Sequence, residues 1–161
     1  MPLQKRTGSR ALGLTLVELM LGLLVALLAL GLLFTGLAHL SRQARCAQLG
    51  ADLQAFAGVL EKSHAAGGRW PATGEEAGAA LRDPRWAAGS PVGGSYGWLP
   101  PAAAGRPGRI TLTAFHPAFP LALTRTELLE LDRRIDDGDL TTGRFRTGFN
   151  GWPVYLVGVQ P

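Results

Sequence analysis

A run of 20 residues near the N-terminus, from Leu19 to Ala38, contains no ionisable side chain. As an α-helix this run would be about 30 Å long, which matches the hydrocarbon core of a bilayer. A cleaved secretory signal peptide is the alternative, but its apolar region is normally only about 7 to 15 residues long and ends in a small-x-small cleavage site. The length therefore predicts a retained transmembrane helix, which we place at residues 14–40.

Basic residues are unevenly placed around this run. Lys5, Arg6 and Arg10 precede it, whereas Arg42 and Arg45 follow it, and this difference weakly favours a cytoplasmic N-terminus. Without Lys5, Arg6 and Arg10, the remaining 13 of the 16 Lys and Arg residues nearly balance the 12 acidic residues, and no run of five like charges occurs. A specific nucleic-acid-binding protein is therefore not expected.

Glu18 is the one acidic residue at the edge of the apolar run. A carboxylate near the end of a membrane helix costs free energy unless it has a partner or reaches the interface. Two interpretations follow from this chemistry alone. Glu18 extends to the lipid headgroups, or it binds a cationic group.

The string Gly13-Leu14-Thr15-Leu16-Val17-Glu18-Leu19 resembles the N-terminus of type IV pilins and type II secretion pseudopilins. In that family a prepilin peptidase cuts after the glycine on the cytoplasmic side, the new N-terminus is methylated, and the glutamate directs assembly. The resemblance implies cleavage between Gly13 and Leu14, N-methylation of Leu14 and an assembly role for Glu18. It also implies a cytoplasmic leader at residues 1–13 and an inner-membrane protein whose domain after about Leu40 is extracytoplasmic.

Physical chemistry supports such a role for Glu18. Cleavage would create a positively charged amine at Leu14 beside an apolar helix, and the Glu18 carboxylate of the same or an adjacent subunit could bind it. In a filament this pair would set the axial register, because a buried unpaired charge is costly in any other register. The expected partners are other pilin or pseudopilin subunits, the prepilin peptidase and an inner-membrane assembly platform.

The chain departs from the family pattern in ways that bear on the subtype. Leu14 stands where the family usually has Phe or Met, and Leu12 stands where a basic residue is common. Cys46 is the only cysteine, so the chain cannot form the C-terminal disulfide of many major pilins. The first two departures bear on the cleavage, whereas the missing disulfide favours a pseudopilin or minor pilin.

Beyond the membrane segment the helical pattern becomes amphipathic. Leu49, Leu53, Phe56 and Leu60 share one face, and the helix should end between His64 and Gly67. This apolar stripe either packs on the domain's own sheet, which we favour, or contacts a neighbouring subunit.

The remaining elements are predicted from local signals. Capping-box patterns at Thr73 and Thr124 predict helices over 74–82, before Pro84, and over 125–136. Strands are expected over 109–115, 143–149 and 153–159, the last two joined by a turn at Asn150-Gly151. Residues 87–108 show no periodicity and should form a loop anchored by Tyr96, Trp98 and Leu99. The expected fold is α+β and pilin-like: one long N-terminal helix on a small antiparallel sheet, with residues 41–161 as the globular domain.

Asp136, Asp137 and Asp139 lie in a predicted turn, where carboxylates could hold Ca²⁺. Alternatively, the three carboxylates end a helix and are solvated. His39, His64 and His116 are isolated and show no metal-ligand spacing. Cys46 is interpreted as a helix-face residue, although an exposed thiol could form an intersubunit disulfide.

The sequence thus predicts a structural filament subunit and not an enzyme, since no nucleotide-binding or hydrolase motif occurs. The alternative is a single-span, membrane-anchored module that binds a ligand and does not assemble. A membrane-anchored enzyme that uses His116 or the Asp136–Asp139 cluster is the least favoured hypothesis.

Overall fold

The structure is a computed structural model that describes residues 15–103, 105–115, 120–148 and 150–159. The chain divides into two compact units, Met1–Leu40 and Ser41–Pro161. The first helix, α1 (Leu16–Gly67), extends through both units and ends where the sequence predicts.

In the first unit, α1 is apolar around its whole circumference. The most apolar 18-residue window of the helix has a mean hydropathy of 2.6, and none of it is buried within the chain. Even Leu30, the least exposed of the large apolar side chains here, is 50% exposed. Among the described residues, α1 is the one helix long and apolar enough to cross a membrane.

The second unit contains a four-stranded antiparallel sheet. Its strands are β1 (Ser95–Leu99), β2 (Gly108–Thr113), β3 (Phe145–Thr147) and β4 (Pro153–Val157). Their order in the sheet is β1-β2-β4-β3, with Trp98 opposite Ile110, Ile110 opposite Tyr155, and Tyr155 opposite Phe145. The predicted hairpin of the last two strands is therefore confirmed.

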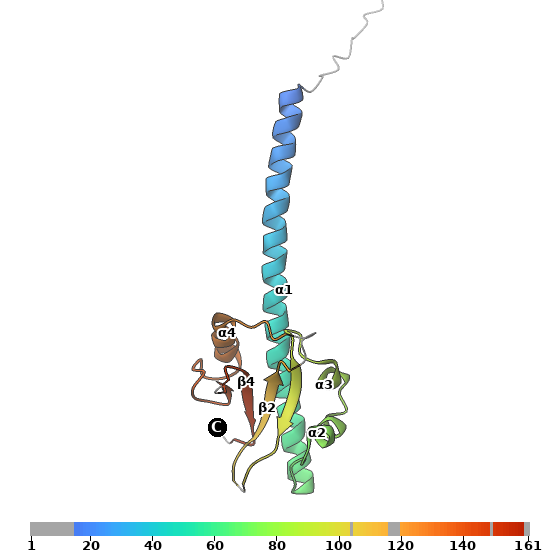
Figure 1. Ribbon diagram of the computed structural model, residues 1–161, viewed down its shortest axis with the longest axis vertical. Helices are drawn as coiled ribbons and strands as arrows, with labels where there is room; N and C mark the ends of the chain where they lie inside the picture. The colour runs from blue at the N-terminus through green and yellow to red at the C-terminus, as the bar shows by residue number, and fades with distance from the viewer. Residues whose placement is uncertain (1–14, 104, 116–119, 149, 160–161) are drawn as a thin grey trace, which may run out of the picture. The chain divides into compact units, whose positions relative to one another are not determined.

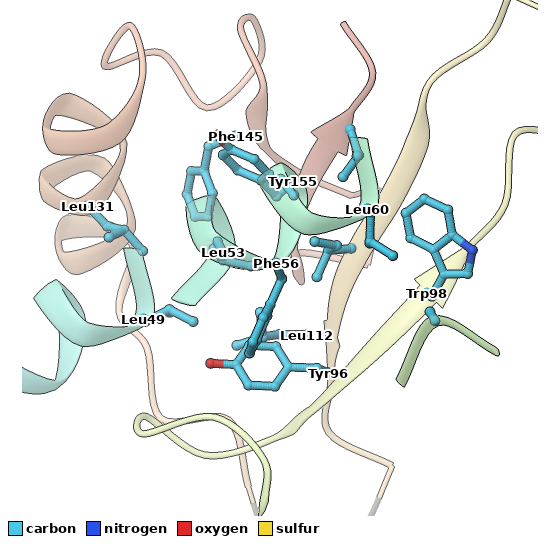
Figure 2. Packing of buried hydrophobic residues seen from close by; sticks show 14 of the residues in the cluster. Leu49, Leu53, Phe56, Leu60, Tyr96, Trp98, Leu112, Leu131, Phe145 and Tyr155 are labelled. Carbon is cyan, nitrogen blue, oxygen red and sulfur yellow. The ribbon is translucent and has the colours of Figure 1, made fainter. Parts of the chain in front are cut away.

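The C-terminal half of α1 packs on this sheet. Figure 2 shows Leu49, Leu53, Phe56 and Leu60 of α1 among buried side chains of the strands, and all four are at most 1% exposed. Phe56 meets Tyr96 of β1 edge-to-face, with ring centroids 5.1 Å apart. The amphipathic stripe thus forms the core of its own domain, and the alternative in which these residues contact a neighbouring subunit is wrong.

Three short helices flank the sheet: α2 (Gly74–Leu81), α3 (Pro84–Ala88) and α4 (Arg125–Ile135). Figure 1 shows α2 and α3 on the β1 side of the sheet and α4 on the opposite side. Thr124 and Glu127 form a reciprocal capping box at the start of α4, as predicted. Thr73 caps α2 by accepting from the backbone N–H of Glu76.

The loop predicted over residues 87–108 is wrong in part. The segment 87–108 contains β1, whose Tyr96 and Trp98 are buried as expected, whereas Leu99 is 45% exposed and anchors nothing. The helix predicted before Pro84 does end before it, but α3, which the sequence analysis did not predict, begins at Pro84, the first helical position after the N-cap Asp83. The predicted strands over 109–115, 143–149 and 153–159 are longer than the observed β2, β3 and β4, and of their predicted residues only residue 149 lies outside the described chain. The α+β class itself is confirmed: one long helix packs on a small antiparallel sheet.

Candidate functional site

The predicted processing site lies outside the described chain, whereas the predicted assembly residue lies within it. Gly13 and Leu14 lie outside the described residues, which begin at Thr15. The structure therefore describes the first turn of α1 and the predicted assembly residue Glu18, but not the bond that a peptidase would cut.

Glu18 takes part in a capping box at the start of α1. Its Oε2 accepts hydrogen bonds from the backbone N–H and the hydroxyl of Thr15, both at 3.1 Å. In return, the N–H of Glu18 donates to Oγ1 of Thr15 at 3.3 Å. Thr15 is thus the N-cap and Glu18 the third helical residue, an arrangement that satisfies free backbone donors at a helix start.

This capping box bears on both interpretations of Glu18. Only Oε2 is used, and Oε1 accepts no hydrogen bond from any described residue. Oε1 can therefore accept a hydrogen bond from a second partner without breaking the cap. Sequence reasoning missed the box, although Thr15-x-x-Glu18 has the same Thr-x-x-Glu pattern that correctly predicted the start of α4.

The acidic turn after α4 is held together by its own hydrogen bonds. Oδ1 of Asp139 accepts from the N–H and hydroxyl of Thr141, at 2.9 and 2.7 Å. Asp137 accepts from the Thr142 hydroxyl at 2.7 Å and from the N–H of Asp139 at 2.9 Å. These hydrogen bonds, chiefly those from the threonine hydroxyls, lower the pKa of both carboxyls below the usual value.

Asp136 connects the turn to the sheet. Its Oδ2 accepts from the backbone N–H groups of Arg144 and Phe145, the latter at 2.8 Å. Gly143 has φ +66°, and a Cβ there would overlap Oδ2 of Asp136 and lie 2.9 Å from Oδ2 of Asp137. Glycine is therefore required at this position for the two carboxylates to converge.

Asp132, on the last turns of α4, is the residue that the sequence analysis did not single out. It is 0% exposed, and neither carboxylate oxygen has a hydrogen-bond partner among the described residues. One oxygen from each of Asp132, Asp136 and Asp137 lies within 4.8 Å of the others. The structure thus brings Asp136 and Asp137 together with Asp132, and Asp139 is not in that group.

The surroundings of Asp132 disfavour its charged form. Burial raises its pKa to about 6, the negative charges of Asp137, Asp136 and Asp139 act in the same direction, and the nearby backbone N–H of Gly138 acts in the opposite direction. A buried carboxylate without a hydrogen-bonded or charged partner is unusual in a folded protein. The helical spacing could have identified it, because Asp132 lies four residues after Leu128 and three before Ile135, on the apolar face of α4.

A second buried carboxylate, Asp52 of α1, is fully partnered. It forms a salt bridge with Nη1 of Arg85 and accepts from the hydroxyl of Tyr96 at 3.2 Å. Burial, followed by the Asp52 charge, raises the pKa of Tyr96. This network joins α1, α3 and β1 and offers no unpaired ligand atom, so we interpret it as structural.

The histidines and the cysteine are dispersed. His64 stacks on Trp70 with ring centroids 4.2 Å apart, His39 lies on α1, and His116 lies outside the described residues. Cys46 is half-buried; burial, and then the charges of Glu127 and Glu130, raise the pKa of its thiol. A raised thiol pKa disfavours the nucleophilic thiolate.

Comparisons with protein-family models, with curated proteins and with solved structures find no match for this chain.

Proposed function

We propose that this chain is a structural subunit of a filament of the type IV pilus or type II secretion kind, most similar to a pseudopilin or minor pilin. In this proposal the prepilin peptidase cuts between Gly13 and Leu14, and Leu14 is methylated. The N-terminus is cytoplasmic, residues 14–40 hold the chain in the inner membrane, and the domain from residue 41 is extracytoplasmic. Assembly then transfers the apolar helix from lipid into the filament.

The observation that carries the proposal is the unpartnered apolar surface of α1 between Leu16 and Leu40. Every described residue of this segment is exposed in the single chain. A helix that is apolar on all sides needs lipid or other apolar helices around it. Moving such a helix from lipid to a bundle of like helices has little net apolar cost, so specific contacts can decide how subunits align.

Glu18 is the contact that we assign to this alignment. It is the one ionisable residue of the segment from Leu16 to Ala38. No described residue donates a hydrogen bond to its Oε1, so this oxygen can accept one from another subunit. A carboxylate is also favourable at a helix N-terminus, and there it could bind the Leu14 amine of a processed neighbouring subunit. The proposal assigns no catalytic step to the chain; the assembly platform and its motor would supply the work.

The proposal is tested with two variants that separate charge from capping. Glu18→Gln removes the charge but retains a side chain that can complete a capping box. Thr15→Ala removes the cap, at about 1 kcal/mol of helix stability, but retains the charge. Formaldehyde cross-linking of subunits in native host cells measures assembly, and resistance to carbonate extraction measures membrane insertion.

We expect Glu18→Gln to reduce cross-linked oligomers by about tenfold or more while insertion is normal, because an uncompensated buried amine costs several kcal/mol. Thr15→Ala should assemble at close to the wild-type level. If both variants assemble normally, the filament proposal loses its support and the membrane-anchored binding module becomes the better account. If Thr15→Ala loses the cross-linked oligomers and Glu18→Gln retains them, Glu18 serves only as a helix cap.

A further inference from the structure

Phe115 is the most exposed large apolar side chain of the second unit among the described residues. It is 81% exposed, whereas Val59 and Leu99, the other two exposed large apolar side chains there, are 38% and 45% exposed. The Phe115 ring lies edge-to-face against Trp152, with ring centroids 4.8 Å apart. Neither ring belongs to the core of the domain. Two adjacent aromatic side chains outside a core indicate a surface that binds something.

The Phe115–Trp152 aromatic pair lies at one end of the sheet. Phe115 is two residues beyond the end of β2, and Trp152 immediately precedes β4. In the antiparallel pairing of these strands Thr111 is opposite Val154, so the end of β2 lies beside the start of β4. The pair therefore covers the end of the sheet at which β2 finishes.

The same end of the sheet is the one at which α1 enters the domain. Ser95, the first residue of β1, is opposite Thr113, the last residue of β2. Val92, three residues before Ser95, lines a cavity together with Arg42 and Arg45 of α1. The aromatic pair and these two arginines are thus on the side of the domain where the chain continues directly from the apolar segment.

Both arginines can bind anionic groups at this end. Each is exposed, and Arg42 lies 3.6 Å from Glu127 in an ion pair at the surface, where such pairs are weak. Nε of Arg45 donates to the carbonyl oxygen of Ser41 at 3.3 Å. A guanidinium has five N–H donors, so these contacts leave each arginine able to bind phosphate oxygens as well.

We propose that the aromatic pair, with Arg42 and Arg45, binds the surface of the lipid bilayer that holds the apolar part of α1. The inference rests on the membrane anchoring in the proposed function and concerns the domain, which that function does not place on the membrane. Tryptophan is enriched at membrane–water interfaces, because its ring is apolar and its N–H binds polar groups. Arginine binds phosphate with a planar, multidentate group. The domain would therefore have a second attachment to the bilayer, which limits its rotation about α1 before assembly.

The test uses the full-length chain in nanodiscs, one chain per disc, made of phosphatidylcholine and phosphatidylglycerol with or without bromine close to the headgroup. Brominated lipid quenches tryptophan emission only at short range, and one chain per disc excludes a second copy as the occupant. Trp152→Phe removes the reporter from the aromatic pair and keeps an aromatic ring. Trp70→Phe is the matched control, because Trp70 stacks on His64 near the other end of the domain's part of α1.

A second pair of variants tests the surface while it keeps Trp152 as the reporter. Phe115→Ser removes the exposed half of the aromatic pair. Leu99→Ser is its control, because Leu99 is also exposed and ends β1, at the opposite end of the sheet from Thr113. Both changes are at exposed positions, where substitutions usually leave the fold intact.

We expect brominated lipid to lower the wild-type emission by about a quarter, since Trp152 is one of four tryptophans and the one at the proposed surface. Trp152→Phe should abolish this loss and Trp70→Phe should keep it. Phe115→Ser should reduce the quenching by about half or more, because less apolar area is left to enter the interface, and Leu99→Ser should not.

Two results overturn the inference alone, in a chain that remains with the nanodiscs. The first is equal wild-type emission in brominated and unbrominated lipid, and the second is quenching that survives in Trp152→Phe. A chain that does not remain with the nanodiscs contradicts the membrane anchoring of the proposed function and this inference with it.

Discussion

Glu127 is the clearest case in which a single side chain links sequence, structure and pH dependence. Its Oε2 accepts from the N–H and hydroxyl of Thr124, both at 2.8 Å, and its own N–H donates to the same threonine. These hydrogen bonds, with the backbone N–H of Thr124 as the largest cause, lower the pKa of Glu127 below its usual 4.5. A carboxylate whose pKa is lowered on folding stabilises the fold when it is ionised.

The resulting prediction concerns acid stability. The contribution of Glu127 should be fully present above about pH 4.5 and lost as the pH falls through its lower folded pKa. In Glu127→Gln the side chain can still cap α4 but does not titrate, so its free energy of unfolding should fall less steeply in acid than that of wild type. Urea unfolding at several pH values measures this slope. Glu130→Gln, an exposed substitution in the same helix, is the control and should keep the wild-type slope. If both variants change the slope equally, the acid dependence does not come from the capping contact of Glu127.

Residue-scale prediction from sequence succeeded where the signal was local. Thr124 and Glu127 are three positions apart, and their pairing needs no information from the rest of the chain. The burial of Asp132 follows from its helical spacing with Leu128 and Ile135, but its lack of a salt-bridge partner depends on how α4 packs against the domain. The same limit applies to Asp52, whose partners Arg85 and Tyr96 lie 33 and 44 positions away.

At the scale of elements, β1 shows why one strand was not predicted. Its burial alternates along Ser95–Leu99, but only Tyr96 and Trp98 face the core, and glycines at 93, 94 and 97 interrupt the pattern. The strand is defined by its pairing with β2, where Trp98 lies opposite Ile110. Strand pairing of this kind depends on tertiary contacts more than on intrinsic propensity.

The packing of β1 against β2 gives an element-scale prediction. A Cβ at Gly108 would overlap Cη2 of the Trp98 ring and lie 2.9 Å from both Cζ2 and Cζ3. Gly108→Ala should therefore lower the free energy of unfolding by about 1 to 3 kcal/mol, measured by urea denaturation.

Gly58 provides the matched control for that change. It lies in α1, and a Cβ there would meet nothing within 4 Å. Gly58→Ala should raise stability by about 0.5 to 1 kcal/mol, because alanine favours helix more than glycine does. Equal effects of the two substitutions would show that backbone propensity, and not the Trp98 contact, decides the outcome at Gly108.

At the scale of the whole molecule, the described core belongs entirely to the second unit. Its first buried residue in the chain is Leu49, and the described residues before Arg45 are all exposed. A fragment that begins at Ser41 should therefore fold without the apolar segment and be monomeric in buffer without detergent. Circular dichroism and analytical ultracentrifugation measure both properties. A fragment that unfolds or aggregates would show that the segment before Ser41 contributes to the stability of the domain.

The central claim, that this chain is a processed filament subunit, is tested most directly by the intact mass of the protein purified from membranes of its native host. We predict a chain that begins at N-methylated Leu14, and a Gly13→Val variant that keeps residues 1–13. A wild-type mass that corresponds to an unmethylated chain beginning at Met1 or Pro2 would contradict the account.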